Sequence, residues 1–164
     1  MIENNILYAE DDPADFWLLE RAFEAERIRE WLHVVSDGTE AMAWLSGEGE
    51  YRDRAKHPLP QLLLLDIRLP KVNGFQVLRW LRAQPQFVAL PVVVFSGDYQ
   101  EGQIAESYRL GASLFLCKPC SPDEMRQVAR FLKAWVDRSG PPAVSEPEWQ
   151  ALKFYGDAGL RSAA

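Results

Sequence analysis

Five short apolar runs alternate along the chain with five amphipathic segments. The apolar runs have the length of strands and are rich in residues that suit buried strands; they span residues 5–9, 31–35, 61–66, 90–96 and 112–117. Three of these runs show almost no polar alternation, which is the pattern expected when helices cover both faces of a parallel sheet. The sequence therefore predicts a sheet that is buried on both sides.

The amphipathic segments carry the start and stop signals of helices. Pro13 stands at the start of the first segment, Gly47 closes the second, and a Ser121 cap followed by Pro122 opens the fifth. Five strand–helix pairs in strict alternation imply right-handed crossovers between parallel strands. We therefore predict an α/β fold with a doubly wound five-stranded parallel sheet for residues 1–138.

Residues 139–164 are predicted to be a linker and a short C-terminal extension. The linker reads "SGPPAV", and the segment after it holds the capping-box pair Ser145 and Glu148, which predicts one short helix before Gly156. An extension of this length cannot hold a DNA-binding output domain, because such a domain needs a core of its own.

Charge and hydropathy exclude several kinds of partner. The net charge of -6 at pH 7 disfavours non-specific binding to nucleic acid. No apolar run is long enough to cross a bilayer, and the start "MIENNILYAEDD" lacks the basic and apolar regions of a signal peptide. We expect a cytoplasmic protein without a nucleic-acid or membrane partner.

Polar residues stand at the carboxyl ends of four of the five predicted strands. Because the carboxyl ends of parallel strands meet at one edge of a sheet, side chains from distant parts of the sequence converge there. The six residues at these strand ends are Glu10, Asp11, Asp12, Asp66, Ser96 and Lys118. This convergence is the strongest functional signal in the sequence.

These residue types fit phosphoryl transfer onto an aspartate. Neighbouring carboxylates repel one another unless a cation joins them, and oxygen-only ligands suit Mg²⁺, so Asp11, Asp66 and a backbone carbonyl make a plausible magnesium site. The ammonium group of Lys118 and the hydroxyl of Ser96 can donate to phosphoryl oxygens. The Asp66 carboxylate would then be the attacking group.

The same residues resemble the receiver domain of bacterial two-component response regulators. The resemblance rests on "EDD" after the first strand, "LLLLDIRLPKVNG" around the third, the serine after "VVVF" and "KP" after the fifth, and it covers roughly residues 5–138. It implies the (βα)5 flavodoxin-like receiver fold, a phosphoacceptor signalling protein and a histidine kinase as phosphodonor. The only chemistry it implies for the chain itself is self-phosphorylation and self-dephosphorylation. Output would pass through protein contacts or a phosphorelay.

The resemblance also assigns roles to individual residues. Asp66 would be the phosphoacceptor, and Glu10 and Asp11 would be the acidic pair, with Glu10 reaching Mg²⁺ through a water; Asp12 lies one place beyond that pair. The family further implies that the Arg68 carbonyl binds the metal, that Ser96 and Phe115 form a switch pair, and that Lys118 precedes a cis proline at Pro119.

Two features point to particular partners. The loop "GEGEYRDRAKHPLP", with "AEDDPADFWLLERAF" and "RLPKVNGFQVLRWLR", resembles stand-alone receivers that partner bacterial phytochromes. On the last predicted helix, Phe131 and Trp135 lie one turn apart beside the core stripe, which predicts a homodimer through this helix. The alternative is that the chain's own tail covers both side chains.

Other functions fit less well. A haloacid-dehalogenase-like phosphatase generally needs a second acid where this chain has Arg68, and the acids of "EDDPAD" would repel the phosphate of a flavin in an electron carrier. A phosphorylation-independent receiver-like interaction module remains the alternative function. Cys117 and Cys120 have the spacing of a redox dithiol, but the pair straddles the end of a strand rather than a helix start, so we interpret the sulfurs as incidental.

Overall fold

The predicted parallel sheet is present, and each strand lies within its predicted run. The computed structural model describes residues 3–149 and 151–155. The parallel strands are β1 (Ile6–Ala9), β2 (Leu32–Val35), β3 (Leu62–Leu65), β4 (Val92–Ser96) and β5 (Leu114–Cys117). They are ordered β2-β1-β3-β4-β5, so the strand order reverses next to β1, where doubly wound folds carry their sites.

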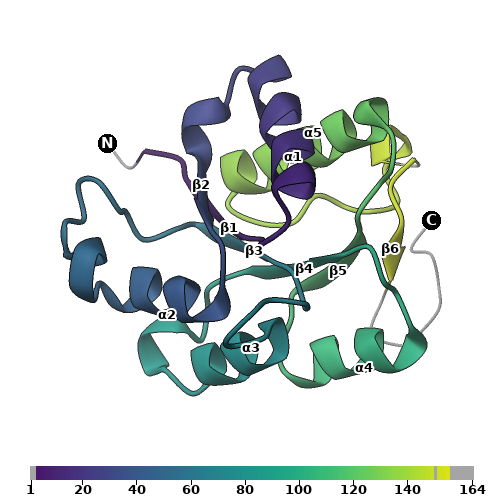
Figure 1. Cartoon of the computed structure of the whole chain (residues 1–164). Helices are drawn as coiled ribbons and strands as arrows, with labels where there is room; N and C mark the ends of the chain where they lie inside the picture. The colour runs from purple at the N-terminus through teal and green to yellow at the C-terminus, as the bar shows by residue number, and fades with distance from the viewer. Residues whose placement is uncertain (1–2, 150, 156–164) are drawn as a thin grey trace.

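In the described part of the chain, α-helices α1 to α5 cover both faces of the sheet (Figure 1). α1 and α5 lie on one side, and α2, α3 and α4 lie on the opposite side. Their bounds are Pro13–Ala25 for α1, Gly38–Ser46 for α2, Gly74–Arg82 for α3, Glu101–Arg109 for α4 and Pro122–Arg138 for α5. The predicted caps are used: the Ser121 side chain accepts from the Glu124 backbone N–H at 3.1 Å.

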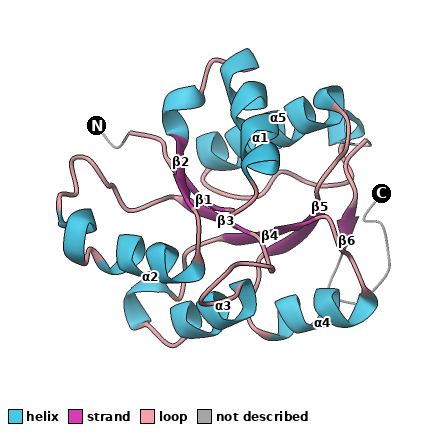
Figure 2. Cartoon of the chain, viewed as in Figure 1, coloured by secondary structure: helices cyan, strands magenta, loops and turns pink. Residues whose placement is uncertain are grey.

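The strands are buried on both faces because their side chains alternate between two cores. On β1, Ile6 and Tyr8 join the core beneath α1 and α5, whereas Leu7 and Ala9 join the core above α2, α3 and α4. The continuous apolarity of the strands therefore has the predicted cause. The connections include the 3-10 turns η1 (Arg29–Trp31), η2 (Gly49–Arg52) and η3 (Pro85–Phe87). Figure 2 shows the strands of the sheet in magenta between the helices in cyan.

The C-terminal segment differs from the prediction. In the described part of the chain it forms a 3-10 turn, η4 (Pro147–Trp149), and a sixth strand, β6 (Phe154–Tyr155), which pairs antiparallel with β5. The predicted short helix over this segment is wrong, and the sheet has six strands instead of five. The physical reason is that β5 would otherwise present an unpaired edge, and pairing with β6 satisfies it: the Cys117 backbone N–H donates to the Lys153 carbonyl at 3.0 Å.

The tail also covers the aromatic side chains that we expected at a dimer interface. Phe131 is 0% exposed and Trp135 is 4% exposed. The Phe131 ring centroid lies 5.3 Å from that of Trp149 and 4.9 Å from that of Phe154. The prediction that Phe131 and Trp135 form an exposed interface is therefore wrong, and the alternative, cover by the chain's own tail, is confirmed.

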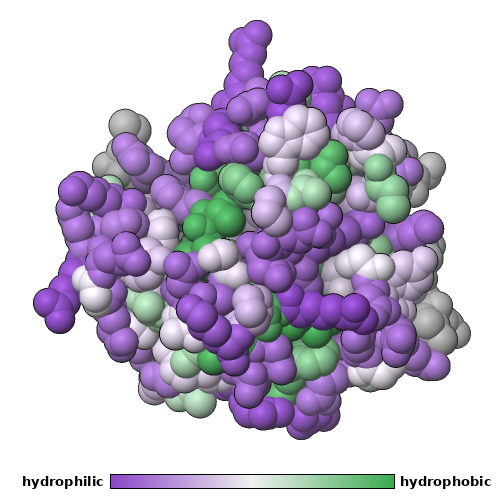
Figure 3. Space-filling view, viewed as in Figure 1, coloured by the Kyte–Doolittle hydropathy of each residue, from purple (hydrophilic) through white to green (hydrophobic). Residues whose placement is uncertain are grey.

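The surface carries few large apolar groups. Figure 3 shows a mostly hydrophilic face with scattered apolar groups. Among the described residues, the large apolar side chains that remain exposed are Trp17, Leu59, Val88 and Tyr99, and none of them belongs to α5. No helix within residues 3–149 and 151–155 is long and apolar enough to cross a membrane.

Candidate phosphoryl-acceptor site

The predicted strand-end residues meet in one pocket. Its volume is about 570 Å³, and it is lined by Glu10, Asp11, Asp12, Asp15, Asp66, Arg68, Ser96, Gly97, Asp98 and Lys118. All six residues that the sequence placed at strand ends are in this lining. The convergence expected from the parallel topology is therefore present in the structure.

Backbone hydrogen bonds at the strand ends hold the pocket together. The Asp66 N–H donates to the Ala9 carbonyl at 3.2 Å, which ties the end of β3 to the end of β1. The Lys118 N–H donates to the Ser96 carbonyl at 2.9 Å, which ties β5 to β4. The backbones of Asp66 and Lys118 are thus held by hydrogen bonds to the neighbouring strands.

Lys118 lies at the centre of the acidic cluster. Its Nζ donates to Asp66 at 2.6 Å, to Asp15 at 2.8 Å and also to Glu10, and only 9% of the side chain is exposed. Burial alone would lower the pKa of Lys118, but the charge of Asp66 and the hydrogen bonds to the three carboxylates raise that pKa above its ordinary value. The ammonium group therefore stays charged and compensates part of the cluster.

Glu10 is the most deeply buried acid of the pocket. It accepts hydrogen bonds from the Tyr8 hydroxyl at 2.9 Å, from the Asp12 N–H at 3.0 Å and from Lys118. Burial raises the pKa of Glu10 to about 7, although the bond to Lys118 opposes this. Burial and the neighbouring Glu10 charge raise the pKa of Tyr8 well above its ordinary value, so its hydroxyl remains a donor.

Asp66 is held by both its backbone and its side chain. One carboxylate oxygen accepts from the Arg68 N–H at 3.1 Å, and the other accepts from Lys118. The chain after Asp66 folds tightly back, with the Gly74 N–H donating to the Ile67 carbonyl at 2.8 Å. A Cβ at Gly74 would lie 2.2 Å from the Asp66 carbonyl oxygen, so only glycine fits there.

The predicted switch pair is divided between the pocket and the core. Ser96 lines the pocket, and its hydroxyl donates to the Asp98 carbonyl at 2.9 Å. Phe115 is buried in the core above α2, α3 and α4, where its ring meets that of Tyr155 edge-on at 6.2 Å. Val94 of β4 is paired with Phe115 of β5, so the two switch residues lie on adjacent strands.

Two charged residues of the pocket were missed by sequence reasoning. Asp15 binds Lys118, and Asp98 pairs with Arg68. A signal for Asp15 existed, because it lies in the first turn of α1, directly after the acidic loop that ends β1. Asp98 stands two residues beyond Ser96, but nothing in the sequence indicated a partner for it.

The acids fit a divalent cation. Glu10, Asp15 and Asp66 each offer a carboxylate oxygen, and these atoms lie within 4.8 Å of one another. An oxygen-only set of this kind suits a hard cation. Asp11 lines the same pocket outside this group of three, while the Asp12 side chain caps α1 by accepting from the Ala14 N–H at 2.9 Å.

The peptide bond before Pro119 is trans, as is every peptide bond in the described segments. The prediction of a cis proline at Pro119 is therefore wrong. The trans isomer is intrinsically favoured, and Lys118 reaches the three carboxylates from it.

The cysteines beside this proline are both free: Cys117 is buried and Cys120 is exposed. Burial raises the pKa of the Cys117 thiol to about 11. A thiol that stays protonated reacts slowly, which favours the structural interpretation over a redox role.

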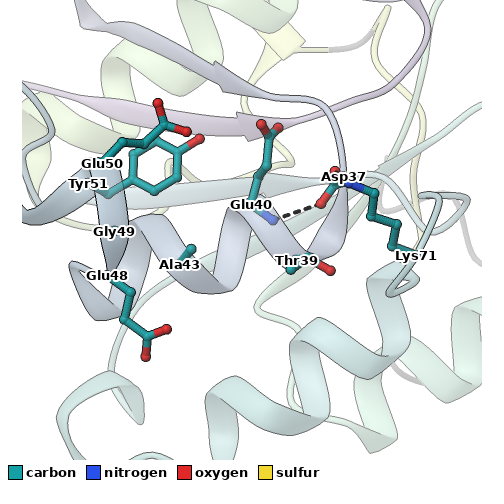
Figure 4. A pocket seen from close by; sticks show the side chains of 9 residues that line it. All are labelled: Asp37, Thr39, Glu40, Ala43, Glu48, Gly49, Glu50, Tyr51 and Lys71. Carbon is teal, nitrogen blue, oxygen red and sulfur yellow. Dashed lines mark hydrogen bonds and ion pairs between the residues drawn. The ribbon is translucent and has the colours of Figure 1, made fainter.

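A second pocket lies beside α2 and includes Asp37, which follows the end of β2. Its volume is about 330 Å³, and Figure 4 shows the side chains around it, including Asp37, Glu40, Tyr51 and Lys71. None of the six predicted strand-end residues lines it. Asp37 has a structural role there, because its carboxylate accepts from the Glu40 N–H at 2.8 Å and caps α2.

Comparison with known proteins decides the family. The sequence profile of the response regulator receiver domain matches residues 6–130. The chain belongs to the response regulator receiver family. The fold of the chain is thus the receiver fold, with β6 added to its sheet.

Similar receivers include proteins named for phytochromes. Response regulator Rcp1 from Synechocystis sp. is 32% identical over 139 residues, which are 84% of this chain and 92% of Rcp1. The phosphorylated cyanobacterial phytochrome response regulator RcpA has a TM-score of 0.75 at 31% identity, covering 85% of this chain and 97% of RcpA. The bacteriophytochrome response regulator RtBRR has a TM-score of 0.68 at 32% identity, covering 92% of this chain and 86% of RtBRR.

A metal-bound structure is also among these relatives. The Mn²⁺-bound form of Rcp1 has a TM-score of 0.73 and covers 86% of this chain and 100% of that structure. The acidic cluster of the present receiver agrees in chemistry with a divalent-metal site.

Proposed function

We propose that this receiver is a response regulator that accepts a phosphoryl group from a histidine kinase onto Asp66. The observation that carries the proposal is the contact of Lys118 with Asp66 at the carboxyl ends of β3 and β5, inside a pocket of 570 Å³. An aspartate at this place can be reached by a phosphodonor, and its charge is balanced by a buried lysine. The protein is a signalling component rather than an enzyme with its own substrate.

The proposed transfer is an in-line displacement at phosphorus. An Asp66 carboxylate oxygen attacks the phosphorus of the phosphohistidine, a P–O bond forms, and the P–N bond to the kinase histidine breaks. Lys118 remains charged and can donate to a phosphoryl oxygen, and the Ser96 hydroxyl can donate to another. Later attack of water on phosphorus would regenerate the Asp66 carboxylate and release phosphate.

Mg²⁺ is the metal proposed for this site. When bound, it would neutralise part of the negative charge that the acids and the phosphoryl group bring together. The proposed ligands are Asp11, Asp66 and the Arg68 carbonyl, with Glu10 acting through a water. The structure adds Asp15 as a candidate because its carboxylate lies with those of Glu10 and Asp66.

The proposed partner is a phytochrome-type sensor histidine kinase. The names of two solved structures similar to this chain, the phytochrome response regulator RcpA and the bacteriophytochrome response regulator RtBRR, support this assignment. Phosphorylation would be read through Ser96 and Phe115 and passed on by protein contacts or a phosphorelay. A homodimer through α5 is kept as a proposal, but it would have to use residues other than Phe131 and Trp135, which are both buried within the chain.

Phosphorylation by a small donor tests the proposal. The protein would be incubated with Mg²⁺ and acetyl phosphate, and its intact mass measured beside that of Asp66→Asn. A gain of one phosphoryl group that is lost in Asp66→Asn and in the presence of a chelator is expected. If the protein stays unmodified with the donor and with phosphorylated kinase, while Mg²⁺ binding is confirmed separately, the alternative of a phosphorylation-independent interaction module is correct.

A further inference from the structure

An ion pair spans the phosphoacceptor pocket between two loops. The Arg68 guanidinium, two residues after Asp66, donates to the carboxylate of Asp98, two residues after Ser96. Arg68 belongs to the loop after β3, and Asp98 belongs to the loop after β4. Both residues line the same pocket as Asp66 and Lys118.

The pocket has few cationic groups that could bind a phosphoryl group. Among the residues that line it, six are acids and two are bases, Arg68 and Lys118. A lysine ammonium group has three N–H donors, and Lys118 already directs them at Glu10, Asp15 and Asp66. A phosphoryl group on Asp66 adds further negative charge and three acceptor oxygens. Lys118 cannot satisfy all of these without leaving an acid.

Arg68 has more N–H donors than its ion pair with Asp98 uses, whereas all three donors of Lys118 are directed at acids. Its guanidinium has five N–H donors in a planar fork, and the ion pair with Asp98 engages one nitrogen. The Arg68 side chain is 71% exposed, so this ion pair is weak and easily exchanged. A phosphoryl group can bind the fork through two oxygens and carries more charge than a carboxylate.

We infer that Arg68 is a phosphoryl-binding residue, and that Asp98 binds its guanidinium until a phosphoryl group is present. In the unphosphorylated protein the guanidinium pairs with Asp98 across the pocket. When a phosphodonor enters, or when Asp66 carries the phosphoryl group, the guanidinium leaves Asp98 and binds phosphoryl oxygens. When the Ser96 hydroxyl turns from the Asp98 carbonyl to a phosphoryl oxygen, its oxygen can still accept from the Asp98 backbone N–H. This inference rests on the proposed function, because it assumes that phosphoryl transfer occurs at Asp66.

A double-mutant cycle on the rate of phosphorylation tests the inference. The initial rate would be measured by intact mass at subsaturating acetyl phosphate and saturating Mg²⁺ for the unmodified protein, Arg68→Gln, Asp98→Asn and the double variant. Asp98→Asn removes the ion pair, so Arg68 is free before the donor arrives. The phosphorylation rate of this variant should rise by up to about fivefold, the ratio that corresponds to the free energy of one exposed ion pair. Arg68→Gln should be slower than the unmodified protein, and the double variant should match Arg68→Gln.

The outcome of the double variant separates this inference from a general charge effect. If loss of the Asp98 charge merely makes the pocket less repulsive to an anionic donor, Asp98→Asn will raise the rate by the same factor with and without Arg68, and the inference is overturned. Equal rates in all four proteins would also overturn it. Absence of phosphorylation in the unmodified protein would instead contradict the proposed function.

A matched ion pair elsewhere supplies the control. Arg109 and Glu106 form an exposed pair on α4, outside the pocket lining. Arg109→Gln and Glu106→Gln change charge in the same way, and neither is expected to alter the rate. A rate change in these variants as large as that in Arg68→Gln would show that net charge, not Arg68, determines donor binding.

Discussion

Lys118 supplies the positive charge at the three clustered acids of the acceptor pocket. Its ammonium group joins three carboxylates that lie within 4.8 Å of one another, and the lysine side chain is almost fully buried. A buried carboxylate without a counter-charge is costly, so the buried acids Glu10 and Asp66 depend on Lys118 when no metal is bound, whereas Asp15 is partly exposed to solvent.

Lys118→Met is expected to destabilise the metal-free protein strongly. The expected loss is about 3–5 kcal/mol of unfolding free energy, because the variant leaves the acids uncompensated. Urea denaturation in the presence of a chelator would measure it. Saturating Mg²⁺ should make the loss smaller, since the cation replaces part of the missing charge; a loss under about 1 kcal/mol without metal would contradict this explanation.

Gly74 is the residue that allows the loop after Asp66 to fold back. Gly74→Ala should lower the unfolding free energy by about 1–3 kcal/mol, because its methyl group would meet the Asp66 carbonyl oxygen at 2.2 Å. Phosphorylation of Asp66 should slow as well. Gly102→Ala is the matched control: nothing lies within 4 Å of its added Cβ, and it should be neutral or stabilising. Equal effects of the two substitutions would contradict a steric cause.

Asp37 gives a pH-dependent prediction. Burial would raise the pKa of Asp37, but the Glu40 N–H and the Lys71 ammonium group hold it below the ordinary value of 3.8. A carboxyl whose folded-state pKa is lowered stabilises the protein above the ordinary pKa, and this contribution is lost as the pH falls through the lowered value. Asp37→Asn keeps the cap of α2 but loses the charge.

The cost of Asp37→Asn should therefore depend on pH. We expect it to destabilise the protein by about 1 kcal/mol at pH 7 and by progressively less below pH 3.8. Urea denaturation of both proteins at pH 7 and at pH 3 would measure the difference. A cost that is the same at both pH values would mean that the carboxylate charge is not what stabilises the start of α2.

At the level of helices and strands, the tail is the part of the fold for which local sequence patterns predicted the wrong structure. The five parallel strands and five helices were predictable because each apolar run and each cap indicates the same element. In the tail, Ser145 and Glu148 favour a helix locally, but the open edge of β5 and the aromatic side chains of α5 determine the outcome. Such long-range pairing overrides propensity, and no local pattern records it.

Phe154→Ala tests whether the tail folds together with the rest of the domain. Phe154 is buried against Phe131, so a loss of about 3–5 kcal/mol of unfolding free energy is expected if β6 is part of one cooperative core. Lys153→Ala, an adjacent exposed position whose backbone bond to Cys117 is kept, should have little effect. A loss below 1 kcal/mol for Phe154→Ala would show that β6 detaches independently.

For the whole molecule, the sequence predicted which residues form the site but not which of these residues contact one another. Parallel topology alone places Glu10, Asp66, Ser96 and Lys118 at one edge, and the structure has them in one pocket. The partners of Lys118 and Arg68 could not be predicted in the same way. Which carboxylates a long side chain reaches depends on rotamers and on the packing of α1 against the sheet, and these are set only when the whole chain has folded.

The proposed function requires Asp66 to be the acceptor among the acids of this pocket, and peptide mapping identifies the acceptor. The protein would be phosphorylated with acetyl phosphate and Mg²⁺, treated with borohydride to reduce the acyl phosphate to an alcohol, digested and sequenced by mass spectrometry. We predict reduction at position 66 alone. Reduction at Glu10, Asp11 or Asp15, with position 66 unchanged, would contradict the proposed function.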